Sequence, residues 1–239
     1  MTSHGLGIDA APFVVALDGP AAAGKSSVGL GAARQLGLGY FDTGLLYRVL
    51  TWLALAKRIA ASDATALATL VDVLGVEVDR AGRVLRRGSD ITAQLHQPEV
   101  DAAVSGVSAH AAVRDAMRPA QRALIHPPGL VVAGRDIGTV IVPEAPLKIW
   151  LTASAEERAR RRAAQTGEPQ DSVLEGMRRR DALDAARAVA PMTPAVDAVQ
   201  IHTDGLASEA VIERVVGLAR ARGARSADVS ATRRDLAEP

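Results

Sequence analysis

Eight residues near the start of the chain have the types and spacing of a phosphate-binding loop. They read Gly-Pro-Ala-Ala-Ala-Gly-Lys-Ser from Gly19 to Ser26, directly after an apolar run over Phe13–Leu17 and Asp18. The two glycines let the backbone curl tightly and present N–H groups to an anion, and a helix that begins near Lys25 adds the positive end of its dipole. The pattern predicts a strand, a loop that cradles the phosphates of a nucleoside triphosphate, and a helix.

Two side chains of this loop carry its chemistry. Lys25 can reach the β- and γ-phosphates, and the Ser26 hydroxyl is the expected ligand of Mg²⁺. A glycine-rich turn without a ligand is the alternative, but the strand, glycines, lysine and serine all fall where phosphate binding needs them. We therefore expect the triphosphate to contact Gly19, Pro20, Ala21, Ala22, Ala23, Gly24, Lys25, Ser26 and Ser27.

Hydrophobic periodicity predicts the elements that position this loop. Apolar runs indicate buried strands over 13–17, 40–41, 130–133, 147–151 and 198–202. Helical spacing indicates helices over 26–36, 45–58, 63–74, 95–104, 105–124, 155–165, 172–186 and 208–222. Strands that alternate with helices predict an α/β fold, in which a parallel sheet is flanked by helices in three layers.

Two stretches depart from this alternation. Residues 76–79 and 83–86 alternate with period two around a turn, so they predict a β-hairpin. Because a hairpin is foreign to a parallel βαβ run, it marks an insertion. Within the helix over 105–124, Pro119 is expected to kink or split the backbone.

The composition is that of a globular chain with a sizeable core. The 239 residues are 48% hydrophobic and 23% charged, which suits one domain or one domain with an insert. The sequence contains no cysteine, which excludes disulfides and thiolate metal sites. Because no apolar run approaches the roughly 18 residues of a membrane span and the N-terminus lacks a signal-peptide pattern, we expect a cytoplasmic protein without a membrane partner.

The charge balance argues against a general nucleic-acid binder. The chain has 28 basic and 27 acidic residues, a net charge of +1, and its basic residues are arginines except for Lys25, Lys57 and Lys148. Arginine suits bidentate contacts to phosphate at discrete sites. For arginines on the surface, a general compositional bias toward arginine is the favoured explanation of the count.

Five blocks of residues together resemble the bacterial cytidylate kinases. This family of P-loop nucleoside monophosphate kinases transfers a phosphoryl group from ATP to CMP or dCMP. The order and spacing of the blocks are more specific than any one of them, and the resemblance runs from about Phe13 to Arg222. The blocks are Asp18–Ser26; Asp42-Thr43-Gly44 with Tyr47 and Arg48; Glu99-Val100 with Ser105 and Arg114; Gly134–Thr139; and Arg180, Asp181, Asp184, Arg187 and Ala190-Pro191.

The resemblance implies partners and a domain plan. The partners would be ATP and CMP or dCMP, with Mg²⁺ as cofactor, and the protein would be a monomer. A single kinase domain would span 13–222, with its core at 13–60 and 105–222, a nucleoside monophosphate-binding insert at about 61–104 and a lid at about 154–170. The resemblance does not cover the two ends: the composition of residues 1–12 predicts a flexible leader, and the lack of periodicity over 223–239 predicts a disordered tail.

The resemblance also implies that several arginines converge on the acceptor phosphate and sugar. These are Arg48, Arg135, Arg180 and Arg187. Some of them would bridge donor and acceptor in the transition state, so Lys25, Arg135, Arg180 and Arg187 are predicted as the catalytic set. For each arginine, a solvated position on a helix face is the alternative.

Recognition of the cytosine base is implied for a second group of residues. Asp136 would accept a hydrogen bond from the amino group of cytosine, while Ser105 and Arg114 would serve N3 and O2. Uracil has a carbonyl in place of that amino group, so Asp136 should disfavour it. A helix cap or a partner for Arg135 is the rival role of Asp136.

Asp184 and Thr43 complete the acceptor side. The resemblance implies that Asp184 binds a ribose hydroxyl; an ion pair with Arg180 or Arg187 on the same helix is the alternative, and the two roles are compatible. Thr43 stands where the family often has serine, and its hydroxyl can form the same hydrogen bonds.

The arginine-dense segment from Glu156 to Arg162 resembles the lid that closes over ATP. Closure would exclude water, which otherwise accepts the phosphoryl group. Arg158 and Arg162 share a helix face, with Arg161 beside them, so we expect this face to contact the donor nucleotide. A solvated helix is the alternative.

One position departs from the family pattern. The residue before Gly134 is usually acidic in this family, and here it is Ala133. An acid at this strand end would be expected to hold Mg²⁺ through water. We expect Asp18 or Asp136 to substitute for it in part.

The sequence leaves two other function classes open. A P-loop kinase for another small acceptor would keep the loop and the lid but not the set of Ser105, Arg114 and Asp136. A non-catalytic nucleotide-binding module would not need two clusters of arginine on the acceptor side.

Overall fold

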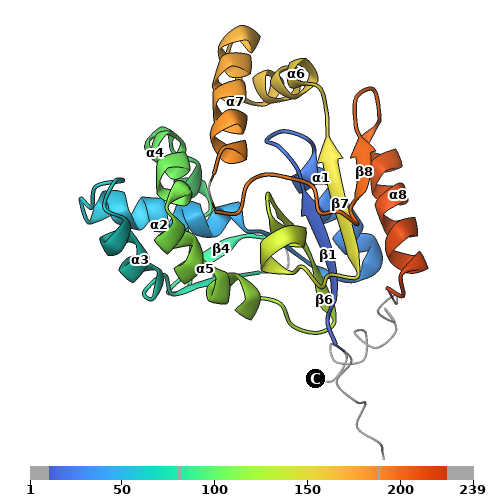
Figure 1. The fold of residues 1–239 in the computed structure, drawn as a ribbon, viewed down its shortest axis with the longest axis horizontal. Helices are drawn as coiled ribbons and strands as arrows, with labels where there is room; N and C mark the ends of the chain where they lie inside the picture. Colours follow the sequence, from blue (N-terminus) through green and yellow to red (C-terminus); the bar gives the residue numbers. More distant parts are fainter. Residues whose placement is uncertain (1–10, 80–81, 188, 225–239) are drawn as a thin grey trace, which may run out of the picture.

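The fold is organised around a parallel five-stranded sheet (Figure 1). The computed structural model of the chain describes residues 11–79, 82–187 and 189–224. The strands follow the order β2-β6-β1-β7-β8, so the strand that precedes the phosphate loop is central. Their bounds are β1 (Phe13–Asp18), β2 (Gly39–Asp42), β6 (Gly129–Gly134), β7 (Leu147–Thr152) and β8 (Val199–His202). The predicted parallel sheet is confirmed.

Alternate residues of β1 face opposite layers of helices. Val15 and Leu17 pack against α1 (Lys25–Leu36) and α8 (Ser208–Ala221). Val14 and Ala16 belong to the core on the other face, which includes α2 (Gly44–Ala56) and α5 (Ala111–Ala123). The three-layer α/β arrangement is therefore confirmed.

The inserted region packs directly on this second core. It contains α3 (Ala64–Val71), a three-stranded antiparallel sheet of β3 (Val76–Val78), β4 (Val84–Arg86) and β5 (Ser89–Asp90), the short helix η1 (Ala93–His96) and α4 (Pro98–Ala109). Leu67, Val84 and Leu95 are fully buried in the core that also holds residues of β1 and β6. The predicted hairpin is confirmed, with a third short strand added; residues 80–81 of its turn lie outside the described residues.

Two helix predictions in this region are wrong. The expected break between residues 104 and 105 lies at His110 instead, because Pro98 at the first helical position, followed by two acidic residues in the first turn, starts a helix that runs to Ala109. Helix α5 also continues through Pro119, so the expected split is wrong, whereas a kink at this residue stays a prediction. This proline is exposed, and the helix is held by Val113 and Met117, which are fully buried.

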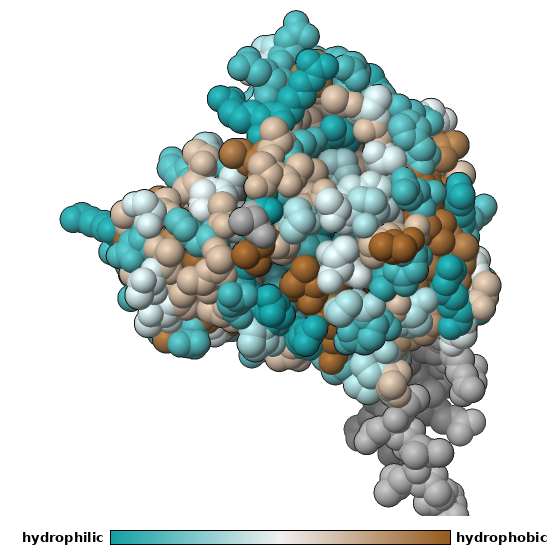
Figure 2. Space-filling model, in the orientation of Figure 1, coloured by the Kyte–Doolittle hydropathy of each residue, from teal (hydrophilic) through white to brown (hydrophobic). Residues whose placement is uncertain are grey.

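Two helices project beyond the carboxyl ends of the strands. They are α6 (Ala155–Thr166) and α7 (Gln170–Ala185), at the top of Figure 1. Gly167 ends α6 in a left-handed conformation with φ of 75°, which glycine adopts without strain. The surface over this region is largely hydrophilic (Figure 2). Among the described residues, no helix combines the length and apolar character that a membrane crossing requires.

Most residues of the predicted leader and tail lie outside the part of the chain that the structure describes. Of the leader over 1–12, residues 1–10 lie outside the described residues, as do residues 225–239 of the predicted tail. The proposed division into core, insert and lid remains a prediction. One helix, α4, runs without interruption through its boundary at residue 104.

Candidate active site

A cavity of about 940 Å³ lies at the carboxyl ends of the strands. Its walls come from the phosphate loop, the start of α2, η1 and α4, the residues after β6, and helices α6 and α7. The cavity brings together all the predicted acceptor-side residues except Ser105. Parts of the chain that are remote in sequence therefore meet beside the loop, in the crevice where α/β proteins bind ligands.

The phosphate loop has the predicted conformation, and two glycines make it possible. Gly19 has φ of 146°, and a Cβ built on it would lie 2.0 Å from the carbonyl oxygen of Leu151. Gly24 has φ of 96° and caps α1, whose first turn has no side-chain cap. The N–H groups at this helix start remain available to an anion.

The Lys25 ammonium group lies inside its own loop. Its Nζ donates hydrogen bonds to the carbonyl oxygens of Gly19, at 2.8 Å, and Pro20, at 2.7 Å. Burial, followed by the positive charge of Arg135, lowers the pKa of Lys25 well below its usual range. A bound polyphosphate would add negative charge beside Nζ, so phosphate binding and the charged form of Lys25 would stabilise each other.

Arg48 ties α2 to the insert. Its Nη1 donates a hydrogen bond to the Leu95 carbonyl oxygen at 2.8 Å, and its Nη2 lies 2.6 Å from the Asp101 carboxylate. Both partners belong to the insert and Asp101 lines the cavity. A phosphate bound near Arg48 would therefore affect the contacts of Arg48 with the insert as well as its position in the core.

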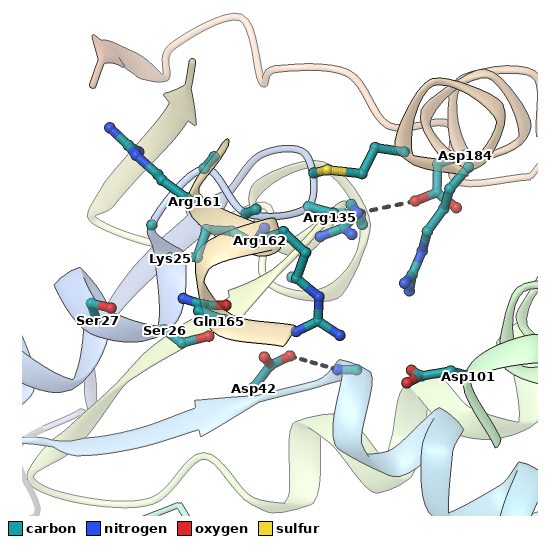
Figure 3. A pocket seen from close by; sticks show the side chains of 18 of the residues that line it. Lys25, Ser26, Ser27, Asp42, Asp101, Arg135, Arg161, Arg162, Gln165 and Asp184 are labelled. Atoms are coloured by element: carbon teal, nitrogen blue, oxygen red, sulfur yellow. Dashed lines mark hydrogen bonds and ion pairs between the residues drawn. The ribbon is translucent and has the colours of Figure 1, made fainter. Parts of the chain in front are cut away.

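Arg135 bridges the phosphate loop and α7. Its Nε lies 3.0 Å from Asp184 Oδ2 (Figure 3). Its Nη1 donates a hydrogen bond to the Gly19 carbonyl oxygen at 3.1 Å. The side chain thus stands between the loop expected to bind the donor and the helix expected to bind the acceptor. Among the described residues, no other side chain forms hydrogen bonds with both Gly19 and a residue of α7.

Arg180 and Arg187 add positive charge from α7 and the turn after it. Arg187 forms an ion pair with Asp184, which confirms one of the two alternatives for this aspartate. The Nε of Arg180 is buried without a hydrogen-bond partner among the described residues. Burial, followed by the charge of Arg135, lowers the pKa of Arg180. A cavity wall with an unpaired guanidinium N–H favours an anionic ligand.

Arg114 and Asp136 form a buried ion pair. Arg114 Nη2 lies 2.5 Å from Asp136 Oδ2, and the two side chains are 5% and 7% exposed. The Arg114 guanidinium also lies over the ring of Tyr47, 5.4 Å from its centroid. Asp136 precedes the helical turn η2 (Ile137–Ile141) without a side-chain cap, so the helix-cap alternative is wrong, and its ion-pair partner is Arg114 rather than Arg135.

A family comparison decides which kinase this arrangement belongs to. Residues 15–221 match the family model described as cytidylate kinase. The chain belongs to the cytidylate kinase family. The resemblance expected from five short blocks is thus confirmed over nearly all of the described chain.

Named cytidylate kinases resemble the chain at similar levels. Those of Mycobacterium avium (strain 104) and Herpetosiphon aurantiacus are 44% and 45% identical, over 89% and 87% of this chain and 97% and 94% of their own lengths. A bifunctional pantoate ligase/cytidylate kinase of Synechococcus sp. (strain CC9902) is 43% identical over 90% of this chain and 46% of its own length. The chain therefore spans about half the length of the bifunctional relatives that it matches.

The arginines of α6 in this cytidylate kinase homologue have different surroundings. Arg161 donates hydrogen bonds to the hydroxyl and carbonyl oxygens of Thr203, at 3.0 and 2.7 Å, and lines the cavity with Arg162. Arg158 does not line the cavity; its Nη1 lies 2.6 Å from Asp181 and 3.3 Å from the Ala21 carbonyl oxygen. Arg158 therefore links α6 to α7 and to Ala21 of the loop. Its contact with a nucleotide stays a prediction.

Ser105 and Thr43 also make contacts within the protein. Ser105 is on α4 but does not line the cavity, whereas Ser108, one turn later, does and donates its hydroxyl to the Ser105 carbonyl oxygen at 3.2 Å. The Thr43 hydroxyl donates to the Ala133 carbonyl oxygen at 3.1 Å, so it ties β2 to β6. Its lone pairs remain able to accept a hydrogen bond from a ligand.

Asp18 fixes the segment that carries Arg135 and Asp136. Its two carboxylate oxygens accept hydrogen bonds from the backbone N–H groups of Ile137, at 2.8 Å, and Gly138, at 2.7 Å. Burial raises the pKa of Asp18 to about 6, against the lowering effect of these hydrogen bonds. Asp18 is thus a positioning residue for the strand end rather than a wall of the cavity.

Stability is expected to report the titration of Asp18. Because its pKa is about 6 in the folded protein and near 3.8 when unfolded, the folded state holds the proton more tightly between these values. The contribution of Asp18 to the free energy of unfolding should therefore fall by roughly 2 to 3 kcal/mol as the pH rises from about 4 to about 6. Urea unfolding of the wild type and of Asp18→Asn over this range measures it; equal pH slopes for the two proteins would contradict the assignment.

Several cavity residues were given no role from the sequence, and three of them have polar or acidic side chains close to the predicted site residues. They are Asp42, Asp101 and Thr203. Asp42 belongs to the block Asp42-Thr43-Gly44 and directly follows a short predicted strand. This position indicates a residue of the ligand site, because the strand ends of α/β sheets meet there. Asp101 and Thr203 carry no such signal, because their partners Arg48 and Arg161 are 53 and 42 residues away in the chain.

The donor atoms near the loop suit magnesium. Among the described residues there is no group of three or more histidine or acidic side chains that could hold a metal alone. Ser26 is exposed on the cavity wall and Asp42 lines the same cavity, which places hydroxyl and carboxylate oxygens beside the loop (Figure 3). Mg²⁺ is usually held by one or two such oxygens together with substrate phosphates and water, so these residues fit it.

Proposed function

We propose that this protein transfers the γ-phosphoryl group of ATP to CMP or dCMP, with Mg²⁺ bound to the nucleotide, and forms the corresponding diphosphate. Membership of the cytidylate kinase family supports this reaction. The observation that carries it is the position of Arg135, which contacts both Gly19 of the phosphate loop and Asp184 of α7. A group that touches both halves of the cavity can stabilise charge that passes from donor to acceptor.

Phosphoryl transfer requires alignment and charge neutralisation more than covalent chemistry from the protein. The loop N–H groups and Lys25 would hold the donor phosphates, and Arg48, Arg180 and Arg187 would hold the acceptor phosphate. Arg135 would neutralise the equatorial oxygens of the transferred group. Bound Mg²⁺, held through Ser26, would neutralise part of the phosphate charge.

The acceptor base would be selected by the Arg114–Asp136 pair. The pair is buried, so a base that matches both an acceptor and a donor is favoured. Cytosine offers an amino group to Asp136 and lone pairs to Arg114. Uracil would present a carbonyl oxygen to the carboxylate and leave a buried polar mismatch.

The lid would exclude water when both nucleotides are bound. Arg161 and Arg162 line the cavity from α6, above the phosphate loop. Their movement onto the donor phosphates would close the cavity and suppress ATP hydrolysis.

A stoichiometric assay tests the reaction itself. With ATP, Mg²⁺ and CMP, we expect one ADP and one CDP per turnover, and ADP formation without CMP at less than about one hundredth of that rate. ATP binding without any acceptor-dependent turnover would favour a nucleotide-binding module. Turnover with a different small acceptor only would favour another P-loop kinase activity.

Asp136→Asn is expected to narrow base selection. An asparagine can rotate its amide to meet either cytosine or uracil, so the ratio of kcat/KM for CMP over UMP should fall at least about tenfold. Asp115→Asn, at an exposed position on α5, is the matched control. An unchanged ratio in a folded Asp136→Asn variant would remove Asp136 from base recognition; thermal unfolding checks that the loss of the buried pair has not unfolded the domain.

We also propose that the protein acts as a monomer in the cytoplasm, without nucleic acid as partner. All the residues that the reaction needs are supplied by one chain and line one cavity. The near-neutral net charge of +1 gives no general attraction to nucleic acid. Light scattering at assay concentration tests the monomer, and a dimer mass would overturn it.

A further inference from the structure

The phosphate loop supplies a hydroxyl for Mg²⁺, and P-loop proteins pair that hydroxyl with an acid at a neighbouring strand end. The strands that flank the loop differ in what they offer there. The central strand β1 ends in Asp18, β6 ends in Ala133 and Gly134, and β2 ends in Asp42. Ala133 carries no oxygen on its side chain, so β6 cannot provide the acid.

Two other aspartates near the loop are already engaged. Both carboxylate oxygens of Asp18 accept backbone hydrogen bonds, and the side chain is buried away from the cavity wall. Asp136 pairs with Arg114 at 2.5 Å in a buried contact. The expectation that either of them replaces the missing acid at position 133 is therefore not supported by their contacts.

Asp42 occupies the equivalent place on the edge strand. In the parallel pairing of β2 and β6, Asp42 lies in register with Ala133. Its Oδ1 accepts a hydrogen bond from the Gly44 N–H at 2.9 Å, which fixes the carboxylate at the start of α2. In Figure 3 the side chains of Asp42 and Ser26 both point into the cavity below the loop.

Asp42 differs in its ion pairing from the other aspartates that line the cavity. Four aspartates line the cavity, and three of them form ion pairs with arginine: Asp101 with Arg48, Asp136 with Arg114, and Asp184 with Arg135 and Arg187. Within the described part of the chain, Asp42 forms no ion pair. An unpaired carboxylate beside bound phosphates would repel them, unless a cation lies between the two.

We propose that the Asp42 carboxylate, together with the Ser26 hydroxyl, holds the Mg²⁺ of the bound nucleoside triphosphate, so that the metal-binding acid of this chain lies on β2 and not on β6. The inference rests on the donor half of the proposed function, which is binding of a triphosphate at the loop. It does not depend on the identity of the acceptor.

Metal binding to the complex with a non-hydrolysable ATP analogue tests this role without turnover. Mn²⁺, which replaces Mg²⁺ at such oxygen sites, can be titrated by electron paramagnetic resonance. For Asp42→Asn, we expect the Mn²⁺ dissociation constant of the complex to rise at least about tenfold. Asparagine can still accept the Gly44 hydrogen bond through its Oδ1, so the start of α2 is preserved.

The same variant should have the opposite effect on the analogue without metal. In the presence of a chelator, removal of a negative charge from the phosphate site should leave the affinity for the analogue unchanged or increase it. A structural role for Asp42 would instead weaken binding with and without metal. This difference in sign separates a metal-holding carboxylate from one that only shapes the cavity.

Asp101→Asn is the matched control, because it removes a carboxylate from the same cavity that is already paired with Arg48. Its Mn²⁺ affinity should equal that of the wild type. Wild-type Mn²⁺ affinity in Asp42→Asn, or equal losses in the two variants, would overturn the proposal. If Asp42→Asn loses Mn²⁺ affinity as expected but the wild type phosphorylates no cytidine nucleotide, the proposed reaction fails and the metal assignment stands.

Discussion

Lys25→Ala is expected to reduce kcat at least about a thousandfold, with the fold retained. Lys25 is the ammonium group that the loop holds within reach of the β- and γ-phosphates, and its loss removes a fixed positive charge from a site that excludes water. Removal of Nζ leaves the buried Pro20 carbonyl oxygen without this donor, whereas the Gly19 carbonyl oxygen still accepts from Arg135 Nη1, so the free energy of unfolding should fall by about 1 to 3 kcal/mol. Steady-state kinetics and urea unfolding measure the two quantities.

Lys57→Ala provides the control for this variant. Lys57 follows the last turn of α2 and is exposed, so its removal should leave kcat and stability near those of the wild type. Turnover within about tenfold of the wild type in Lys25→Ala would contradict the assignment of the loop. A collapse of stability without a separate effect on kcat would show that Lys25 mainly holds the loop together.

Arg135→Ala is expected to lower kcat by about a thousandfold and to change KM for CMP much less. An arginine that neutralises charge on the transferred phosphoryl group acts chiefly in the transition state, and such arginines contribute about 10³ or more to rate. Asp184 keeps its ion pair with Arg187, so the acceptor side is not left with an unpaired buried charge. Arg135→Lys should recover part of the loss, since it restores charge but not the planar fork.

The alternative is that Arg135 only fastens the loop to α7. In that case Arg135→Ala would lower stability and raise KM for both nucleotides, while kcat stayed within a few-fold of the wild type. Arg34→Ala, an exposed arginine near the end of α1, is the control for loss of one guanidinium group. Its kinetic constants should match those of the wild type.

The local parts of the site were predictable from the sequence, because local spacing determines them. The positions of Gly19, Gly24, Lys25 and Ser26 fix a loop whose conformation depends on backbone freedom within a few residues. The strands and most helices followed from periodicity for the same reason. The helix break at His110 did not, because the helix signal of Pro98 with its acidic first turn competed with an apolar pattern that suggested a different start.

The acceptor half of the cavity could not be built from spacing. Arg135 and Asp184 are 49 residues apart, and Asp18 reaches Ile137 over 119 residues, so only the folded sheet brings them together. The family resemblance supplied these residues as a set but not their orientation. Ser105 and Arg158 show the limit: Ser105 lies on α4 instead of the helix expected over 105–124, Arg158 lies on the expected helix, and neither side chain lines the cavity.

The direction of the Asp42 side chain is a second case of this kind. A short strand followed by an acid was visible in the sequence, but its alignment with Ala133 depends on the pairing of β2 with β6. That pairing joins residues that lie far apart in the chain. Taken together, the ends of the parallel strands predict that Asp42 lies at the ligand site, which no single motif predicts.

The most direct test of the account is a comparison of acceptors with the wild-type protein. Values of kcat/KM for CMP, dCMP, UMP and AMP, measured with saturating ATP and Mg²⁺, report how the buried Arg114–Asp136 pair discriminates among bases. We expect CMP and dCMP to be used, and CMP to exceed both UMP and AMP by at least about a hundredfold, since the mismatched bases leave buried polar groups unpaired. Comparable kcat/KM values for CMP and either UMP or AMP would contradict the assignment of this chain as a cytidylate kinase.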